Sequence, residues 1–192
     1  VLRRDRRIIG LLAIGTLPAV IVGVPLRLFF SDWLNSPMLA GCMFPLTGAL
    51  LVWGGRMKPG AVDCGDLGYG RALWIGAFQA LAVLPGISRS GASIVAGLSC
   101  GLKREEAAAF SFLLAIPIIG GAGLLEAGYL VGQSFDLVTI GLLGLGLALS
   151  FAVGLAALAW LIQWLKTGRL YYFAWWVFLL GPAVIVWQLL AG

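Results

Sequence analysis

The residues best suited to chemistry lie in one short stretch, residues 84–93, which reads Leu-Pro-Gly-Ile-Ser-Arg-Ser-Gly-Ala-Ser. One arginine stands there among serines and glycines: Gly86, Ser88, Arg89, Ser90 and Gly91. A guanidinium group is a permanent cation whose planar fork of donors matches phosphate oxygens. Serine hydroxyls add further donors, and glycines let a ligand approach the backbone closely. The pattern predicts an anion site and favours phosphate or pyrophosphate as the anion.

The apolar runs on both sides of this stretch are each too short to cross a membrane. Runs of about 12 and 9 residues form helices of roughly 18 and 14 Å, whereas the hydrocarbon core is about 30 Å thick. We therefore predict a re-entrant hairpin over residues 72–102, with Arg89 near the midplane and a second half-helix that begins near Gly91 or Ala92. A charge at that depth marks a functional site. The alternative is a Pro-Gly kink whose arginine pairs with an acid elsewhere.

The composition predicts a single transmembrane domain over residues 1–192, of the all-α polytopic class. Hydrophobic residues make up 61% of the chain and charged residues only 11%, against about 25% charged residues in soluble domains. The mean hydropathy is +1.02. No nucleic-acid partner is expected, because the basic residues do not interleave with aromatic residues on a polar surface. The sequence has no histidine, and its three cysteines match no metal motif, so no metal ligand is predicted from the chain itself.

Five apolar segments are predicted to cross the membrane: residues 8–30, 37–53, 107–125, 137–165 and 170–190. We expect the first span to be interrupted at Pro18 and Pro25, where prolines are tolerated when neighbours or side chains satisfy the freed carbonyls. Residues 31–36 and 126–136 are expected to be loops, which makes Glu126 a loop acid, and residues 166–169 a turn.

The basic residues support a hairpin that enters and leaves the membrane on one side. In that topology 11 of the 13 basic residues fall on one face: Arg3, Arg4, Arg6, Arg7, Arg56, Lys58, Arg71, Lys103, Arg104, Lys166 and Arg169. The exceptions are Arg27 and Arg89. Cytoplasmic loops carry an excess of Lys and Arg, so the hairpin is predicted to enter from the cytoplasmic side. Glu105 and Glu106 are expected to pair with the two basic residues before them, or with solvent.

Two segments of the sequence carry a resemblance to known proteins. The first is residues 79–93, which contain the Pro-Gly-Ile-Ser-Arg-Ser-Gly signature, and the second is Phe-Ser-Phe-Leu-Leu-Ala-Ile-Pro at residues 110–117. Together they closely resemble the bacterial undecaprenyl-pyrophosphate phosphatase family, also called bacitracin-resistance proteins. The resemblance implies a membrane hydrolase of the bacterial inner (plasma) membrane. That enzyme converts undecaprenyl pyrophosphate to undecaprenyl phosphate, which recycles the lipid carrier for peptidoglycan synthesis. It also implies an inverted repeat with two antiparallel re-entrant hairpins, and dependence on Mg²⁺ or Ca²⁺.

The chain departs from that family at its start. The family has an earlier hairpin with a Gln-x-x-x-Glu stretch and a Ser-Ser-Thr-Gly-His run, whose glutamates and histidine are held to be catalytic. This sequence contains neither, and Val83 stands where the mirror-related hairpin would carry the glutamate. We therefore expect the sequence to be truncated at its N-terminus by about a third of the family length. The chain alone is expected to lack the acid/base and metal-binding half of the site.

The resemblance and the residues together suggest roles around Arg89, which is expected to clamp the pyrophosphate and to stabilise charge in the transition state. Ser88 and Ser90 would orient the substrate, and the identity of the nucleophile stays open because no base is visible to activate either hydroxyl. Gly86 and Gly91 are expected to allow close approach of the substrate. Two further substrate contacts are predicted, at Gln79 and Ser93. For Gln79 a helix–helix hydrogen bond is an equal alternative, and packing is the favoured role of Ser111.

Two other functions stay open at this stage. Half-helix hairpins and inverted repeats are features of transporters, so a lipid-phosphate carrier or flippase is one alternative. A pyrophosphate-binding membrane protein without catalysis is the other. The expected partners are the bilayer and a polyprenyl pyrophosphate lipid, and a homodimer is one assembly that we keep open.

Overall fold

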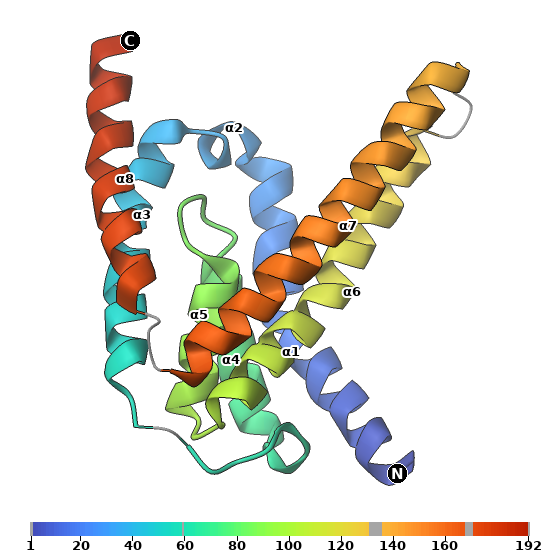
Figure 1. Cartoon of the computed structure of the whole chain (residues 1–192), viewed down its shortest axis with the longest axis vertical. Helices are drawn as coiled ribbons and strands as arrows, with labels where there is room; N and C mark the ends of the chain where they lie inside the picture. The colour runs from blue at the N-terminus through green and yellow to red at the C-terminus, as the bar shows by residue number, and fades with distance from the viewer. Residues whose placement is uncertain (1, 59, 131–135, 168–170, 192) are drawn as a thin grey trace.

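The computed structural model describes the chain except for residues 1, 59, 131–135, 168–170 and 192. The described residues form α-helices and one short 3₁₀ helix, with a single isolated bridge in place of strands. The helices, shown in Figure 1, are α1 Leu2–Phe29, α2 Ser31–Leu34, α3 Pro37–Arg56, η1 Cys64–Asp66, α4 Tyr69–Leu81, α5 Arg89–Ser99, α6 Arg104–Leu130, α7 Leu137–Lys166 and α8 Tyr171–Ala191. This confirms the all-α fold class.

Five of these helices, α1, α3, α6, α7 and α8, are long and apolar enough to cross a membrane. They correspond to the five predicted spans, so the chain is a multi-pass membrane protein. The other two major helices are short, with 13 residues in α4 and 11 in α5. Figure 1 shows them as a hairpin whose entry and exit lie at the same end of the molecule as the N-terminus. Helices of that length reach only about 16 to 20 Å, as expected for a re-entrant element.

Three expectations about the spans are wrong in detail. Helix α1 continues through Pro18 and Pro25 without interruption, because neighbouring groups in a membrane helix can satisfy the carbonyls that a proline frees. Residues 31–34, predicted as loop, form the short helix α2. Helix α6 extends to Leu130, so Glu126 is helical rather than a loop acid, and it pairs with Arg27 at 3.5 Å. The rest of the predicted loop, at 131–135, and the end of the predicted turn, at 168–169, lie outside the described residues.

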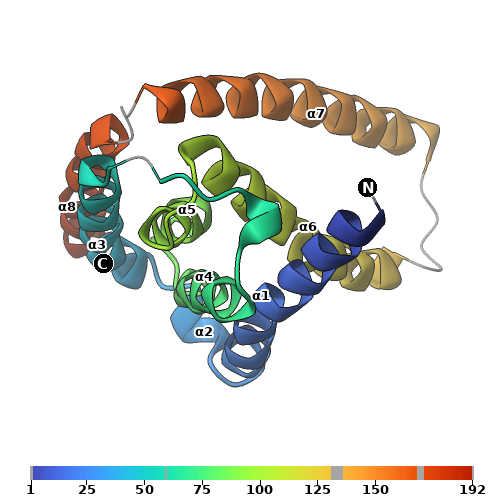
Figure 2. The ribbon, with the colours of Figure 1, turned by 90° about the horizontal axis from the view of Figure 1, so that it is seen from below.

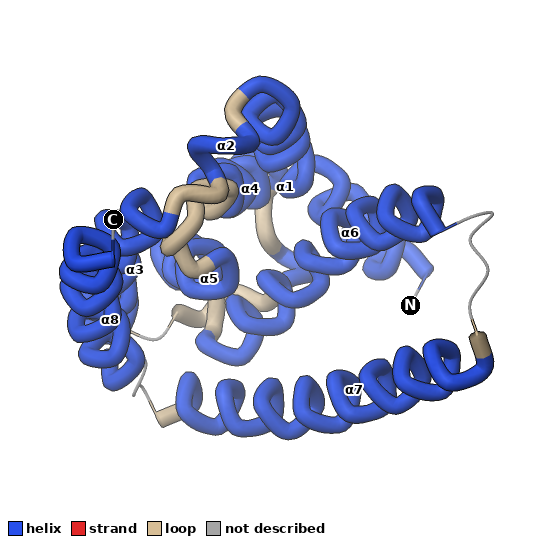
Figure 3. The backbone as a smooth tube through the Cα atoms, turned by 90° about the horizontal axis from the view of Figure 1, so that it is seen from above, coloured by secondary structure: helices blue, strands red, loops and turns tan. Residues whose placement is uncertain are grey.

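Helix α5 lies at the centre of the packing. It contacts α3, α4 and α6, and its residues from Gly91 to Leu98 are all buried. Around it α1 packs against α4, and α3 packs against α8. Figures 2 and 3 both show this core beside α7, which runs along one side of the molecule. None of the α7 window that is apolar enough to span a membrane is buried, so α7 adds little to holding the hairpin.

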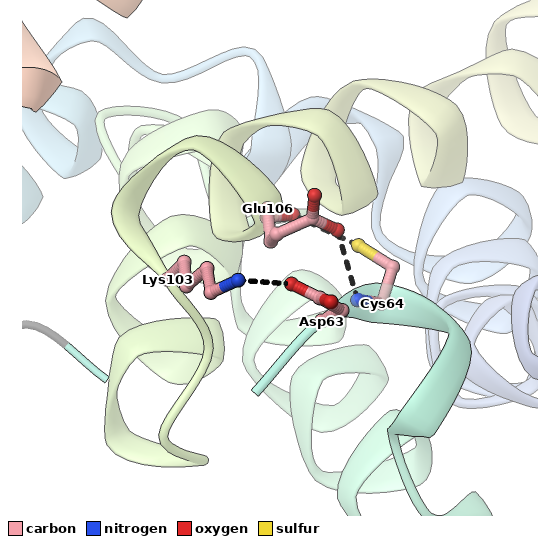
Figure 4. A network of polar contacts seen from close by, with 4 residues as sticks. All are labelled: Asp63, Cys64, Lys103 and Glu106. Atoms are coloured by element: carbon pink, nitrogen blue, oxygen red, sulfur yellow. Dashed lines mark hydrogen bonds and ion pairs between the residues drawn. The ribbon is translucent and has the colours of Figure 1, made fainter. Parts of the chain in front are cut away.

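The base of the hairpin is tied to the connector that precedes it by a set of polar contacts, which we call the clasp: Val62, Asp63, Cys64, Gly101, Lys103 and Glu106. Figure 4 shows the four of these residues that contact one another through side chains, Asp63, Cys64, Lys103 and Glu106. The Val62 N–H donates to the Gly101 carbonyl at 3.0 Å, and the Lys103 N–H donates to the Val62 carbonyl at 3.1 Å. The Lys103 ammonium lies 2.7 Å from an Asp63 oxygen. The clasp thus joins the connector before α4 to the segment that follows α5.

The clasp corrects the expected pairing of the charged turn. Glu106 accepts the Cys64 N–H at 2.9 Å, and Glu105 pairs with Lys166 at 3.3 Å. Neither acid pairs with the basic residues directly before it, because Lys103 faces Asp63 instead. Burial and the neighbouring Glu106 raise the pKa of the Cys64 thiol to about 12. Cys64 therefore stays protonated at neutral pH.

Candidate functional site

The two halves of the hairpin are joined by residues 82–88, which we call the tip turn. Helix α4 ends in a series of tight turns, and the Ile87 N–H then donates to the Leu84 carbonyl at 3.2 Å. Between them Gly86 has a φ of +88°, a backbone conformation that costs other residues energy. A Cβ at Gly86 would overlap the backbone of Ala40 in α3. The glycine is therefore required both by its conformation and by close contact with α3.

A second anchor of the tip turn is Thr47 of α3, which the sequence analysis did not identify. Its side chain is 3% exposed. The Thr47 hydroxyl donates to the Gly86 carbonyl at 2.8 Å and accepts the Ser88 N–H at 3.0 Å. The only sequence signal is a hydroxyl inside an otherwise apolar span, which is too common in membrane helices to single out a site.

Helix α5 begins at Arg89, two to three residues earlier than predicted. Ser88 is its N-cap, and the Ser88 hydroxyl accepts the Gly91 N–H at 3.1 Å. Serine is among the preferred N-cap residues because its side chain satisfies an N–H that the first turn leaves free. A Cβ on Gly91 would lie 3.0 to 3.2 Å from Ser88 and Leu51. Gly91 therefore leaves room for the cap to close against α3.

Arg89, the first residue of α5, is held on two sides. Its Nε donates to Gln79 Oε1 at 3.1 Å, and its Nη2 donates to the Leu114 carbonyl at 3.0 Å. Pro117 lies one turn further along α6, and a proline loosens the helix turn before it and leaves carbonyls available. Leu114 is about ten residues from the start of α6, a rise of about 15 Å. That is about half of a hydrocarbon core of about 30 Å, consistent with the predicted depth.

The contacts of Gln79 and Ser93 continue this polar cluster between α4, α5 and α6. Gln79 is 2% exposed, and its Nε2 has no hydrogen-bond partner among the described residues. The Ser93 hydroxyl donates to the Arg89 carbonyl at 2.8 Å and lies 2.6 Å from the hydroxyl of Ser111 on α6. Gln79 thus makes the interhelical hydrogen bond that was one of its two predicted roles, and its amide keeps a free donor.

The other predicted residues face the opposite side of α5. Ser88, Ser90 and Gly91 line a cavity of about 450 Å³ between α3, α5, α7 and α8. Its other walls are largely apolar and include Phe44, Leu51, Ile94, Leu161, Phe173, Trp176, Val177 and Leu180. The structure therefore divides the predicted site: Arg89, Gln79 and Ser93 lie toward α6, whereas the serines that flank Arg89 lie toward the cavity. The two groups meet at the N-terminus of α5.

The meeting point offers several donors to an anion. The backbone N–H groups of Arg89 and Ser90 and the Ser90 hydroxyl make no hydrogen bond within the described part of the chain. The Arg89 Nη1 also has no partner there and is not sealed off by protein. A helix N-terminus adds a partial positive charge. These groups can bind a phosphate, but the described residues contain no cluster of three or more His, Cys, Asp or Glu that could hold a metal ion.

Comparison with known proteins assigns the chain that forms this site to a family. Residues 2–183 match the family described as Bacitracin resistance protein BacA. The chain belongs to the BacA family. The tip turn, its N-cap and the Arg89 contacts therefore describe the Pro-Gly-x-Ser-Arg-Ser-Gly segment of a BacA protein.

Several curated relatives of this BacA chain carry the name undecaprenyl-diphosphatase. The protein of that name from Rhodopirellula baltica is 47% identical over 190 residues, which is 98% of this chain and 74% of the relative. Those from Desulforapulum autotrophicum and Desulfosudis oleivorans are 38% and 45% identical, over 95% and 92% of this chain but 65% and 63% of the relatives. The chain thus spans about two thirds to three quarters of the length of these relatives.

Proposed function

We propose that this chain acts in the hydrolysis of undecaprenyl pyrophosphate to undecaprenyl phosphate and inorganic phosphate. The observation that carries the proposal is the position of Arg89. It is the first residue of α5 in a BacA chain, and two hydrogen bonds fix its guanidinium, one to Gln79 and one to the Leu114 carbonyl, about ten residues from the start of α6. A cation at that depth is costly unless it is paired or serves an anionic ligand. The relatives named undecaprenyl-diphosphatase support the same substrate.

In the proposed reaction, water supplies the oxygen that attacks the terminal phosphorus, and the bond from that phosphorus to the bridging oxygen breaks. The free N–H groups of Arg89 and of the first turn of α5 bind the phosphate oxygens and stabilise the negative charge that develops on them. The largely apolar cavity beside Ser90 accommodates the first part of the prenyl chain. The Ser88 hydroxyl already caps α5, so Ser90 is the serine with a hydroxyl available to the substrate.

The described residues do not fit a divalent cation at this position. Hard cations such as Mg²⁺ and Ca²⁺ take oxygen ligands, carboxylates above all, whereas the groups around the tip turn are hydroxyls, N–H donors and a guanidinium cation. We derive no step through a metal. The predicted dependence on Mg²⁺ or Ca²⁺ remains a proposal, to be measured as activity before and after chelation with EDTA.

The cellular setting follows from the proposed substrate. A carrier lipid of peptidoglycan synthesis is used in the bacterial plasma membrane, so we propose that this membrane contains the protein. A homodimer stays part of the proposal, and the mass of the protein in native detergent micelles measures it.

Phosphate release from undecaprenyl pyrophosphate, measured in detergent for the chain alone and for a version extended at its N-terminus, tests the function. We expect Arg89→Ala to lower release by about 100-fold or more, the usual cost of removing one electrostatic stabiliser. Arg89→Lys keeps the charge but loses the planar fork, so we expect an intermediate rate. Arg27→Ala is the matched control, because Arg27 is an exposed arginine that pairs with Glu126 rather than with a residue of the tip turn.

Three other results would contradict the proposed function or the role of Arg89 in it. Binding of the substrate without release would support a non-catalytic binding protein. Movement of labelled lipid phosphate across liposomes without release would support a carrier. Equal rates for Arg89→Ala and Arg27→Ala would overturn the role of Arg89.

A further inference from the structure

Thr47 is the point at which a membrane-spanning helix holds the tip turn from outside the hairpin. One hydroxyl serves two backbone groups, because it donates to the Gly86 carbonyl and accepts from the Ser88 N–H. A threonine hydroxyl has one hydrogen and two lone pairs, so this arrangement uses its donor in full. The two partners are 39 and 41 positions away in the sequence.

The choice of partner distinguishes Thr47 from another threonine of the chain. Serine and threonine in helices commonly bond back to a carbonyl of their own helix. Thr16 does so in α1, where its hydroxyl donates to the Leu12 carbonyl at 2.7 Å. Thr47 instead makes its two hydrogen bonds to the tip turn, with the Gly86 carbonyl and the Ser88 N–H. Its hydroxyl therefore serves the turn rather than α3.

The two bonds determine where α5 begins. The Ser88 N–H precedes the helix, so no bond of the helix ladder satisfies it, and the Gly86 carbonyl belongs to a residue at positive φ. The peptide groups before and after Ile87 are thus oriented by a single side chain. The residue that follows Ser88 is Arg89, whose backbone N–H and guanidinium face the bound anion in the proposed site. A small rotation at Ser88 would move both.

We propose that Thr47 is a positioning residue for the pyrophosphate site, which acts through Gly86 and Ser88 to set the placement of Arg89 and Ser90. Nothing in the proposal requires Thr47 to touch phosphate. It rests on the proposed function of the tip turn. It predicts that pyrophosphate binding depends on the hydroxyl of Thr47 rather than on the volume of its side chain.

Binding of farnesyl pyrophosphate to the whole chain in detergent tests the proposal, together with amide hydrogen exchange of residues 82–92. Thr47→Val keeps the shape of the side chain and removes the hydroxyl, and we expect about 10- to 100-fold weaker binding, the scale on which misplacement by about 1 Å acts. The Ser88 amide should exchange at least about tenfold faster in this variant, since its acceptor is gone. Thr47→Ser keeps the hydroxyl and should bind within about threefold of the wild type.

Thr16→Val is the matched control, because it removes a threonine hydroxyl whose bond stays within one helix. We expect wild-type binding and unchanged exchange in the tip turn. If Thr47→Val does not fold, as judged by its thermal transition, Thr47→Cys replaces it. A thiol is a weaker donor of similar size, so Thr47→Cys should bind between the serine variant and complete loss.

The outcomes separate this inference from the proposed function. Wild-type binding that Thr47→Val or Thr47→Cys leaves unchanged would overturn the inference alone. Weak binding by both Thr47→Ser and Thr47→Val would also overturn it, because volume rather than the hydroxyl would then matter. Absence of farnesyl pyrophosphate binding by the wild type would overturn the proposed function and the inference together.

Discussion

At Gly86 one backbone angle decides whether the tip turn can form. Its φ of +88° is costly for a residue with a Cβ, about 1 to 2 kcal/mol, and the Cβ would also overlap Ala40. We expect Gly86→Ala to lower the free energy of unfolding by at least about 2 kcal/mol, measured by thermal denaturation in detergent. Gly70→Ala, in α4 with nothing within 4 Å of the added carbon, should leave it unchanged or slightly raised. Equal losses in the two variants would contradict this account of the tip turn.

Some residues of the candidate site could be predicted from the sequence, and others could not. Arg89 stands out because a charge inside an apolar run is costly and therefore has a purpose. Gln79 is only ten positions from it on the facing half-helix, so a contact between them could be anticipated. Thr47 could not be anticipated, because its partners lie on another element and only the packing of α3 against the tip turn brings them together. The division of the serines and Arg89 between two sides of α5 likewise depends on helix phase, which follows from the exact start of α5 at its N-cap.

Among the elements, the clasp should contribute to stability through a partly buried hydrogen bond rather than through its surface charges. Glu106 accepts the Cys64 N–H, so Glu106→Ala leaves that donor unpaired, at a cost of about 1 to 3 kcal/mol in the free energy of unfolding. Glu105→Ala is the matched control. It removes the neighbouring carboxylate, which makes an exposed pair with Lys166, and such pairs are worth about 0 to 1 kcal/mol. Chemical denaturation in detergent measures both. A Glu105→Ala loss as large as that of Glu106→Ala would show that the clasp does not act as described.

The lengths of the elements were predictable, but several of their ends were not. Apolar run length alone gives five spans and a hairpin with arms too short to cross, because backbone groups in lipid must be bonded within helices. The residue at which a helix begins or ends depends on the groups that its terminal residues contact. Helix α5 starts at Arg89 because Ser88 can cap it, and α6 continues past Glu126, which pairs with Arg27 on α1. Prolines at 18 and 25 looked like breaks, yet α1 remains helical through both.

At the scale of the whole molecule, the topology is what turns a short hairpin into a site. Figure 1 shows the N-terminus, the connector before α4 and the junction of α5 with α6 at one end, with α2 at the other. The tip turn points from the first end toward the second and is held on both sides by spanning helices, at Thr47 of α3 and Leu114 of α6. We expect a hairpin held in this way to carry its donors to mid-depth without crossing the membrane.

The native thiols allow this topology to be tested by labelling. Burial and Glu106 raise the pKa of Cys64 to about 12. At pH 7 almost none of this thiol is then ionised, and the thiolate is the reactive form. A parent protein in which Cys42 and Cys100 are replaced by alanine, and Cys64 is kept, should therefore give little label with a membrane-impermeant maleimide. It provides the background for single cysteines placed elsewhere.

Three exposed positions then decide whether the hairpin re-enters or crosses. Lys58→Cys lies before the hairpin, Lys103→Cys lies after it, and Asp32→Cys lies in α2. In sealed inverted vesicles, which expose the cytoplasmic face, we expect the first two to react and the third to be protected. In right-side-out vesicles the pattern should reverse. A hairpin that crosses the membrane would place Lys103→Cys with Asp32→Cys, since one additional crossing inverts every position after it. That result would remove the basic residues from a common face, and with it the reason to place Arg89 at the apex of a re-entrant loop.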